Sequence, residues 1–210
     1  ETGLPYEVHP IDIGAGDQFG EQFLKISPNN RIPAIVDRSG PDRTPMPLFE
    51  SGAILFYLAE KTGYFLPNDG HGRYRTMEWV MWQMGGLGPM LGQAHHFRQY
   101  APERVQYAYD RYTNESNRLY RVMEKRLAET PYLAGQHYSI ADMAAFPWTR
   151  SAHKQGVELE EFPNVRRWQA AIEERAAVQR GLQVLADHRK ESFDETAREV
   201  LFGSTQFDRR

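Results

Sequence analysis

The chain has 210 residues, with 25 lysines and arginines against 28 aspartates and glutamates, and it contains no cysteine. This near balance of charge argues against a nucleic-acid partner or an anionic membrane surface, and favours a small organic ligand. The lack of cysteine excludes a disulfide framework, a thiolate zinc site and a cysteine nucleophile within these residues, and it favours a reducing, cytoplasmic location. No apolar run approaches the roughly 20 residues that a membrane helix needs.

The first residues have the pattern of a strand followed by a short helix. Residues 6–13 place apolar side chains among polar neighbours and end in a glycine-rich turn, which predicts a short strand. Residues 17–26 carry phenylalanine, leucine and isoleucine at helical spacing before a stop signal at Pro28. A strand and a short helix are therefore expected here.

Two brief apolar runs follow, at residues 33–37 and 45–49, and a turn-rich segment separates them. This pattern predicts a hairpin, with Pro33 at the first position of a strand. Residues 51–61 are apolar almost all round, which indicates a buried helix. With the strand at 6–13, we expect a thin three-stranded sheet that contains one parallel pair and one hairpin.

After the segment 67–70 no strand pattern appears, and helical periodicities continue to the end of the chain. We therefore expect two domains, a small α/β domain at 1–66 and an all-helical domain at 71–210. In the second, a glycine-rich run at 85–89 should interrupt a helix, and residues 139–142 (SIAD) form a capping-box start. Pro163 suits the first position of another helix.

The sharpest local signals are residues 29–35 (NNRIPAI), followed across the hairpin by 49–52 (FESG). With SIAD and residues 85–97 (GGLGPMLGQAHHF), they resemble the glutathione transferases over nearly the whole chain. The resemblance is closest to bacterial nu-class members, which reduce disulfides using glutathione and are related to the yeast nitrogen-regulatory prion protein. It implies an α+β thioredoxin-like N-terminal domain, incomplete at its start, followed by an all-α helical-bundle C-terminal domain.

The resemblance also implies the function. We expect a glutathione-dependent transferase or disulfide-bond reductase that uses glutathione as co-substrate on a small electrophile or disulfide. We expect a homodimer, because the family dimerises through the first helices of its second domain. Neither a metal, a nucleic acid nor a membrane is expected as a partner.

Within the resemblance, Pro33 is the family's cis proline. A cis bond would turn the backbone N–H and C=O of Ile32 outward, to pair with the cysteine backbone of the ligand as an added strand. Without the resemblance, the ordinary interpretation of Pro33 is a trans proline that opens a strand.

Four further side chains match positions of the family's glutathione site. Ser51 opens a helix whose N-terminus would hold the γ-glutamyl carboxylate, and Glu50 would take the ligand's ammonium. Gln18 matches the side chain that contacts the glycine end, and Arg111 matches an arginine sent from the helical domain. Without the resemblance, Ser51 and Glu50 are interpreted as a helix cap with a nearby acid. Gln18 is then a polar loop residue, and Arg111 is a solvated arginine.

His95 and His96 raise the question of a metal site. Adjacent residues of a helix point about 100° apart, so two such histidines rarely bind one ion from one face. No metal is therefore expected.

The family's thiolate-activating hydroxyl or amide comes from its first strand and the following turn, and this sequence begins beyond them. No catalytic residue can therefore be named. The alternative hypothesis is a non-catalytic glutathione-binding or regulatory protein with the same fold. A third is a fold-only scaffold, as in family members of the lens or of translation factors, and the intact Ile-Pro and Glu-Ser pairs argue against it.

Overall fold

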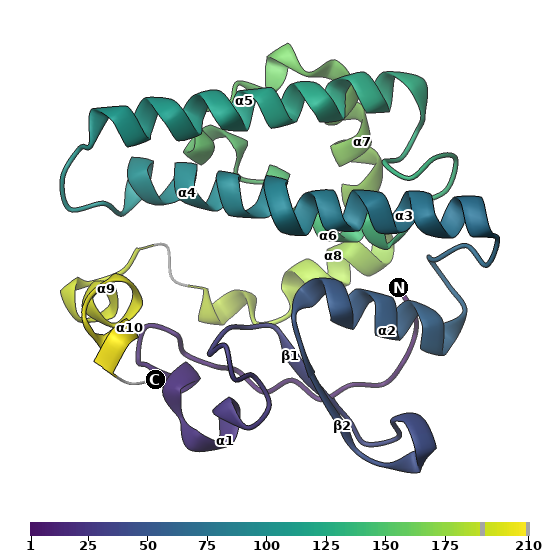
Figure 1. The fold of residues 1–210 in the computed structure, drawn as a ribbon, viewed down its shortest axis with the longest axis horizontal. Helices are drawn as coiled ribbons and strands as arrows, with labels where there is room; N and C mark the ends of the chain where they lie inside the picture. The colour runs from purple at the N-terminus through teal and green to yellow at the C-terminus, as the bar shows by residue number, and fades with distance from the viewer. Residues whose placement is uncertain (190–191, 209–210) are drawn as a thin grey trace. The chain divides into compact units, whose positions relative to one another are not determined.

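The computed structural model describes residues 1–189 and 192–208 (Figure 1). The chain divides into two units. An α/β unit comprises Gly3–Tyr57 and Leu182–Arg210, and a helical unit comprises Glu1–Thr2 and Leu58–Gly181. The domain bounds proposed from the sequence, at 66 and 71, stay a prediction.

The hairpin of the α/β unit is confirmed. Strands β1 (Ala34–Asp37) and β2 (Met46–Phe49) pair antiparallel, with Ala34 opposite Phe49 and Asp37 opposite Met46. At the far end of the hairpin, Tyr57 Oη donates to Asp37 Oδ2 at 2.7 Å. This bond fixes the end of β1 to helix α2 (Ser51–Thr62).

The strand expected at residues 6–13 is wrong, and so is the three-stranded sheet. Within the described ranges only β1 and β2 form a sheet, and Tyr6 and Val8 are 74% and 41% exposed. An isolated extended segment has no ladder partner for its N–H and C=O groups. The alternation of apolar side chains at 6–13 indicates extended backbone but does not supply that partner.

The single helix expected at 17–26 is divided. A 3₁₀ turn (Asp17–Phe19) and helix α1 (Glu21–Leu24) are separated by Gly20, whose backbone is extended. Helix α2 (Ser51–Thr62) follows β2 as expected. Near the end of the chain, α9 (Glu195–Phe202) and α10 (Thr205–Asp208) follow one another.

The helical unit contains the end of α2, from Leu58 on, and most or all of six further α-helices within its described residues. These are α3 (Gly70–Trp82), α4 (Gly88–Gln99), α5 (Gln106–Glu129), α6 (Ile140–Thr149), α7 (Pro163–Glu173) and α8 (Ala176–Gln183). The expected interruption at 85–89 is a π-helical turn at Gln83–Leu87. Helix α5 lies along α4 (Figure 1). Apolar side chains that are nearly or fully buried make the core: Val80, Leu87, Leu91, Leu119, Met123, Leu127, Val165, Trp168 and Ile172.

Asp142 holds three segments of this core together. The expected capping box forms, with the backbone N–H of Ser139 donating to Asp142 Oδ2 at 3.0 Å. The other carboxylate oxygen accepts from the Leu133 backbone N–H at 2.9 Å and from the indole N–H of Trp168 at 2.8 Å. Burial raises the pKa of Asp142, and these hydrogen bonds oppose the rise. The residue is thus a buried junction as well as a cap.

Helix α7 receives its cap from another helix. It begins at Pro163, as expected, and the Glu124 carboxylate of α5 accepts from the backbone N–H groups of Asn164 and Val165 at 3.0 Å. A carboxylate at a helix N-terminus satisfies unpaired N–H groups and complements the helix dipole. The capping acid is therefore non-local.

Candidate functional site

The antiparallel register brings the two sharpest sequence signals to one end of the hairpin. Ala34 of β1 lies opposite Phe49 of β2, so Pro33 and Glu50, one step beyond them, flank the same hairpin end. The Ile32–Pro33 peptide bond is cis, as the resemblance implied. Ile32 is 51% exposed. The exposed residue Ile32 and the start of a helix therefore lie at the same end of the hairpin.

The loop that presents Ile32 is held by its own side chains. The buried Ser27 donates its hydroxyl to the Arg31 carbonyl at 2.7 Å and accepts from the Arg31 backbone N–H at 3.4 Å. Asn30 is buried with a left-handed backbone (φ 48°), and its side-chain oxygen accepts from the Arg31 guanidinium at 3.1 Å. The loop is thus ordered up to the residue before Ile32. Ser27 and Asn30 were given no role from the sequence, although a turn-forming Ser-Pro-Asn-Asn run marked the place.

On the opposite strand, Glu50 turns the chain into helix α2. Its side chain is exposed, and its φ of 69° lies in the left-handed region, which costs a non-glycine residue of order 1 kcal/mol. Its carbonyl accepts from the Ile54 N–H at 2.9 Å, so Glu50 occupies the N-cap position and Ser51 begins the helix. The N–H groups of the first turn point out of the helix end, where the dipole favours an anion.

Gln18 is buried, contrary to the picture of an exposed loop residue. It is 2% exposed, and its amide nitrogen donates to the Ile13 carbonyl at 3.2 Å. Its Oε1 is buried and has no hydrogen-bond partner among the described residues. Such an unsatisfied acceptor costs about 1–3 kcal/mol, so a donor supplied by a ligand or by water would stabilise this side chain.

Arg111 belongs to the helical unit and not to the unit that holds the other candidates. On α5 its guanidinium lies 3.8 Å from the Glu115 carboxylate, and its side chain is 53% exposed. Glu115 binds Arg118 more closely, through two hydrogen bonds of 2.8 and 2.7 Å, and the first cause of its lowered pKa is Arg118. Many of the N–H groups of the Arg111 guanidinium are therefore not engaged by Glu115.

The two adjacent histidines of α4 face different aromatic rings. His95 stacks on Tyr100 with centroids 5.2 Å apart, and His96 meets Phe97 edge-on at 5.3 Å. Burial lowers the pKa of both histidines. In the described part of the chain, no three His, Cys, Asp or Glu side chains are grouped so that they could hold a metal ion.

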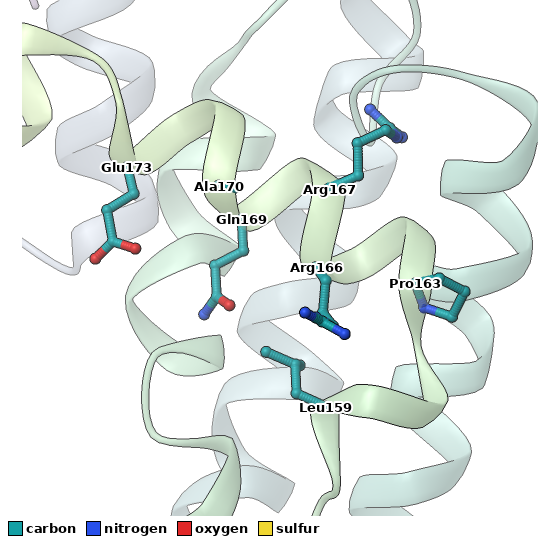
Figure 2. A pocket seen from close by; sticks show the side chains of 7 residues that line it. All are labelled: Leu159, Pro163, Arg166, Arg167, Gln169, Ala170 and Glu173. Atoms are coloured by element: carbon teal, nitrogen blue, oxygen red, sulfur yellow. The ribbon is translucent and has the colours of Figure 1, made fainter.

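A surface hollow of the helical unit is lined by none of the six predicted site residues. It measures about 500 Å³ and is formed in the helical unit by α7 and the turn before it (Figure 2). Figure 2 shows Arg166 and Gln169 near Leu159, whereas Arg167 points away from it. Arg167 donates to the carbonyls of Leu127 and Thr130, at 2.9 and 3.3 Å. The hollow contains no nucleophile or base paired for catalysis.

Among the helices of residues 1–189 and 192–208, none has the length and apolar character that spanning a bilayer requires.

Comparison with known proteins gives two domain matches. The family of glutathione S-transferase N-terminal domains matches residues 1–60, and that of the C-terminal domains matches residues 80–176. The Escherichia coli disulfide-bond oxidoreductase YfcG is 49% identical over 195 residues, which cover 91% of this chain and 91% of that protein.

Two solved structures are also similar. A glutathione transferase from Burkholderia graminis, with two glutathione molecules bound per subunit, has a TM-score of 0.83 and 47% identity, covering 91% of this chain and 81% of that one. A glutathione transferase from Pseudomonas putida, with one glutathione disulfide bound per subunit, has a TM-score of 0.83 and 44% identity, covering 87% and 82%.

Proposed function

Because this chain belongs to the glutathione S-transferase family, we propose that it binds glutathione and uses the glutathione thiol on a disulfide or a small electrophile. The observation that supports this most is the hairpin register, which brings the exposed Ile32 and the start of α2 to one end of the sheet. An extended peptide can pair with such a main-chain edge while its carboxylate meets the helix N-terminus.

Each end of the tripeptide has a matching group in this arrangement. The backbone of Ile32 pairs with the cysteine residue of glutathione. Ser51 and the first turn of α2 take the γ-glutamyl carboxylate, and Glu50 takes the ammonium. Gln18, with its unpaired oxygen, serves the glycine end, where the peptide N–H is a donor. Arg111, the remaining residue that the resemblance names, stays a prediction. Pro33 holds the turn that presents Ile32.

The absence of cysteine from these 210 residues restricts the disulfide chemistry. A glutathione thiolate attacks one sulfur of the substrate, a mixed disulfide forms, and the other sulfur leaves as a thiolate that takes a proton. A second glutathione thiolate then attacks the glutathione sulfur, giving glutathione disulfide and a second free thiol. Both electrons come from glutathione. The two glutathione molecules per subunit of the B. graminis relative support this scheme.

The second candidate is a glutathione-binding or regulatory protein without thiol chemistry. It differs from the first candidate in one property, which is that it does not stabilise the glutathione thiolate. Glutathione's thiol, like that of free cysteine, has a pKa of about 8.5 and is mostly protonated at neutral pH. A protein that grips the peptide without lowering this pKa binds it and does not activate it.

Three measurements separate the candidates. Isothermal titration calorimetry measures glutathione binding, and a glutathione reductase-coupled assay follows NADPH oxidation during reduction of 2-hydroxyethyl disulfide. Conjugation of glutathione to 1-chloro-2,4-dinitrobenzene tests whether the thiol is used on an electrophile. We expect binding and turnover in proportion to protein. Binding without turnover in either assay would establish the second candidate, and the absence of both would refute the glutathione site.

We also propose a cytoplasmic homodimer. A chain that draws its reducing power from glutathione fits a reducing compartment. On α3, Tyr74 and Met81 are 68% and 55% exposed and are seven residues apart, so they share one helix face. A pair of exposed apolar side chains on one face suits a subunit contact.

Replacing both side chains, in Tyr74→Glu/Met81→Glu, should convert the dimer to a monomer at micromolar concentration. Burying two carboxylates opposite their symmetry mates is strongly unfavourable. Sedimentation velocity gives the mass. Arg75→Gln, an exposed residue about 100° around the same helix from Tyr74, serves as the surface control. A parent protein that sediments as a monomer would refute the dimer, and a dimeric double variant would refute this face.

A further inference from the structure

The end of the chain is tied to the loop that presents Ile32. Both terminal nitrogens of the Arg31 guanidinium donate to Gln206 Oε1, each at 3.2 Å, across 175 residues of sequence. Both residues belong to the α/β unit. Arg31 immediately precedes Ile32, so this contact acts on the main chain that the proposed function assigns to glutathione.

Gln206 is held so that only its oxygen is offered to Arg31. It is 7% exposed, and its Nε2 donates to the Val200 carbonyl at 2.6 Å. A side-chain amide with its nitrogen engaged in this way has its oxygen orientation fixed. The acceptor is therefore pre-positioned by the tail itself.

The tail that carries Gln206 is an ordered element. Asp194 caps α9 through the Ala197 backbone N–H at 2.8 Å, and Ala197 is buried. The Glu199 carboxylate accepts from the Ser204 N–H at 2.8 Å, which closes the turn between α9 and α10. Residues 194–208 thus form a small folded piece, which we name the C-terminal latch (yellow in Figure 1).

Arg31 connects the C-terminal latch to the side chains that hold the loop, which are those of Ser27 and Asn30. Its Nη1 donates to Asn30 Oδ1 as well as to Gln206, and its backbone is clasped by the hydroxyl of Ser27. Without Gln206, the guanidinium would return to solvent. The loop would then keep only its local bonds, which span four residues or fewer.

We propose that the C-terminal latch fixes the conformation of the glutathione-binding loop, with Arg31 and Gln206 as positioning residues for the main chain of Ile32. This inference rests on the proposed function, which it deepens. It predicts that the latch acts on glutathione affinity and not on the chemical step, since neither side chain is assigned to the thiol. Pre-organising a binding loop raises affinity by lowering the ordering cost on binding.

The test is a double-mutant cycle on Arg31→Leu and Gln206→Leu. Each single variant should raise the KM for glutathione about three- to tenfold, the size expected for one or two lost hydrogen bonds, with kcat within about twofold of the parent. The double variant should be no worse than either single one, because both remove the same contact. Gln206→Glu keeps an acceptor for Arg31 but loses the donor to the Val200 carbonyl, so it should recover only part of the affinity. Phe207→Ala, a 75% exposed neighbour, is the matched control and should leave the KM unchanged.

Hydrogen exchange keeps the inference testable apart from glutathione. In the unliganded protein, the amide N–H groups of residues 30–32 should exchange faster in Gln206→Leu than in the parent or in Phe207→Ala. Unchanged hydrogen exchange in Gln206→Leu, or additive effects of the two substitutions on the KM for glutathione, would overturn the proposal. If the parent binds no glutathione but exchange still accelerates in Gln206→Leu, the latch stands as a loop-ordering device and the proposed function is what fails.

Discussion

Asp142→Ala should lower the free energy of unfolding by about 3–5 kcal/mol, the range for breaking a buried charged network. The carboxylate is fully buried and accepts from the Leu133 N–H, the Trp168 indole and both the N–H and hydroxyl of Ser139. Its removal leaves these donors buried without an acceptor. In a chain of this size the loss corresponds to a fall in Tm of roughly 6–20 °C, measurable by calorimetry.

Two further variants serve as comparisons for Asp142→Ala. Asp142→Asn keeps the volume and one acceptor oxygen, so its loss should be intermediate. Asp187→Ala removes an exposed aspartate and should change stability by less than about 0.5 kcal/mol. A Tm for Asp142→Ala equal to that of Asp187→Ala would show that the buried network does not stabilise the fold.

Glu50→Gln should weaken glutathione binding by about 10- to 100-fold, because the proposed partner of Glu50 is an ammonium and a charge-assisted hydrogen bond contributes about 1.5–3 kcal/mol. The glutamine keeps the side-chain size and the left-handed backbone, so the change isolates the charge. Ser51→Ala should weaken binding about fivefold through the lost hydroxyl. Titration calorimetry gives both affinities.

The control for these variants is Glu60→Gln on the same helix, an acid that pairs with Arg73 on the surface. It should bind glutathione like the parent, and all three variants should keep the parent's circular dichroism spectrum. If Glu50→Gln and Ser51→Ala both bind glutathione with unchanged affinity, the peptide does not lie along α2 as proposed.

Local signals in the sequence were sufficient for the hairpin, the start of α2 and the capping box of α6. Each depends on residues within a few positions of one another, such as the Ile-Pro pair before β1 or Ser139 with Asp142. The strand at 6–13 failed for the opposite reason, because a strand exists only with a partner that the local pattern does not name. The same limit hid the full role of Asp142, since Trp168 lies 26 residues away.

In the candidate site, the sequence pointed to Ile32, Pro33, Glu50 and Ser51, and the register accounts for their common location. It did not indicate the left-handed backbone at Asn30 and Glu50, because no glycine marks either position. Nor could it reveal the Arg31–Gln206 contact, since an arginine and a glutamine 175 residues apart carry no pattern. The burial of Gln18 was equally hidden, because a glutamine at the start of a short predicted helix carries no signal of burial.

The left-handed backbone at Glu50 has a consequence for how this position can evolve. Glycine there would remove the conformational cost and stabilise the chain, but it would also delete the carboxylate proposed to hold the ammonium. Stability and recognition therefore pull in opposite directions at one residue. In relatives that no longer bind the ligand, selection would not prevent a change of this residue to glycine. The amino acid at this position therefore indicates whether binding is still under selection.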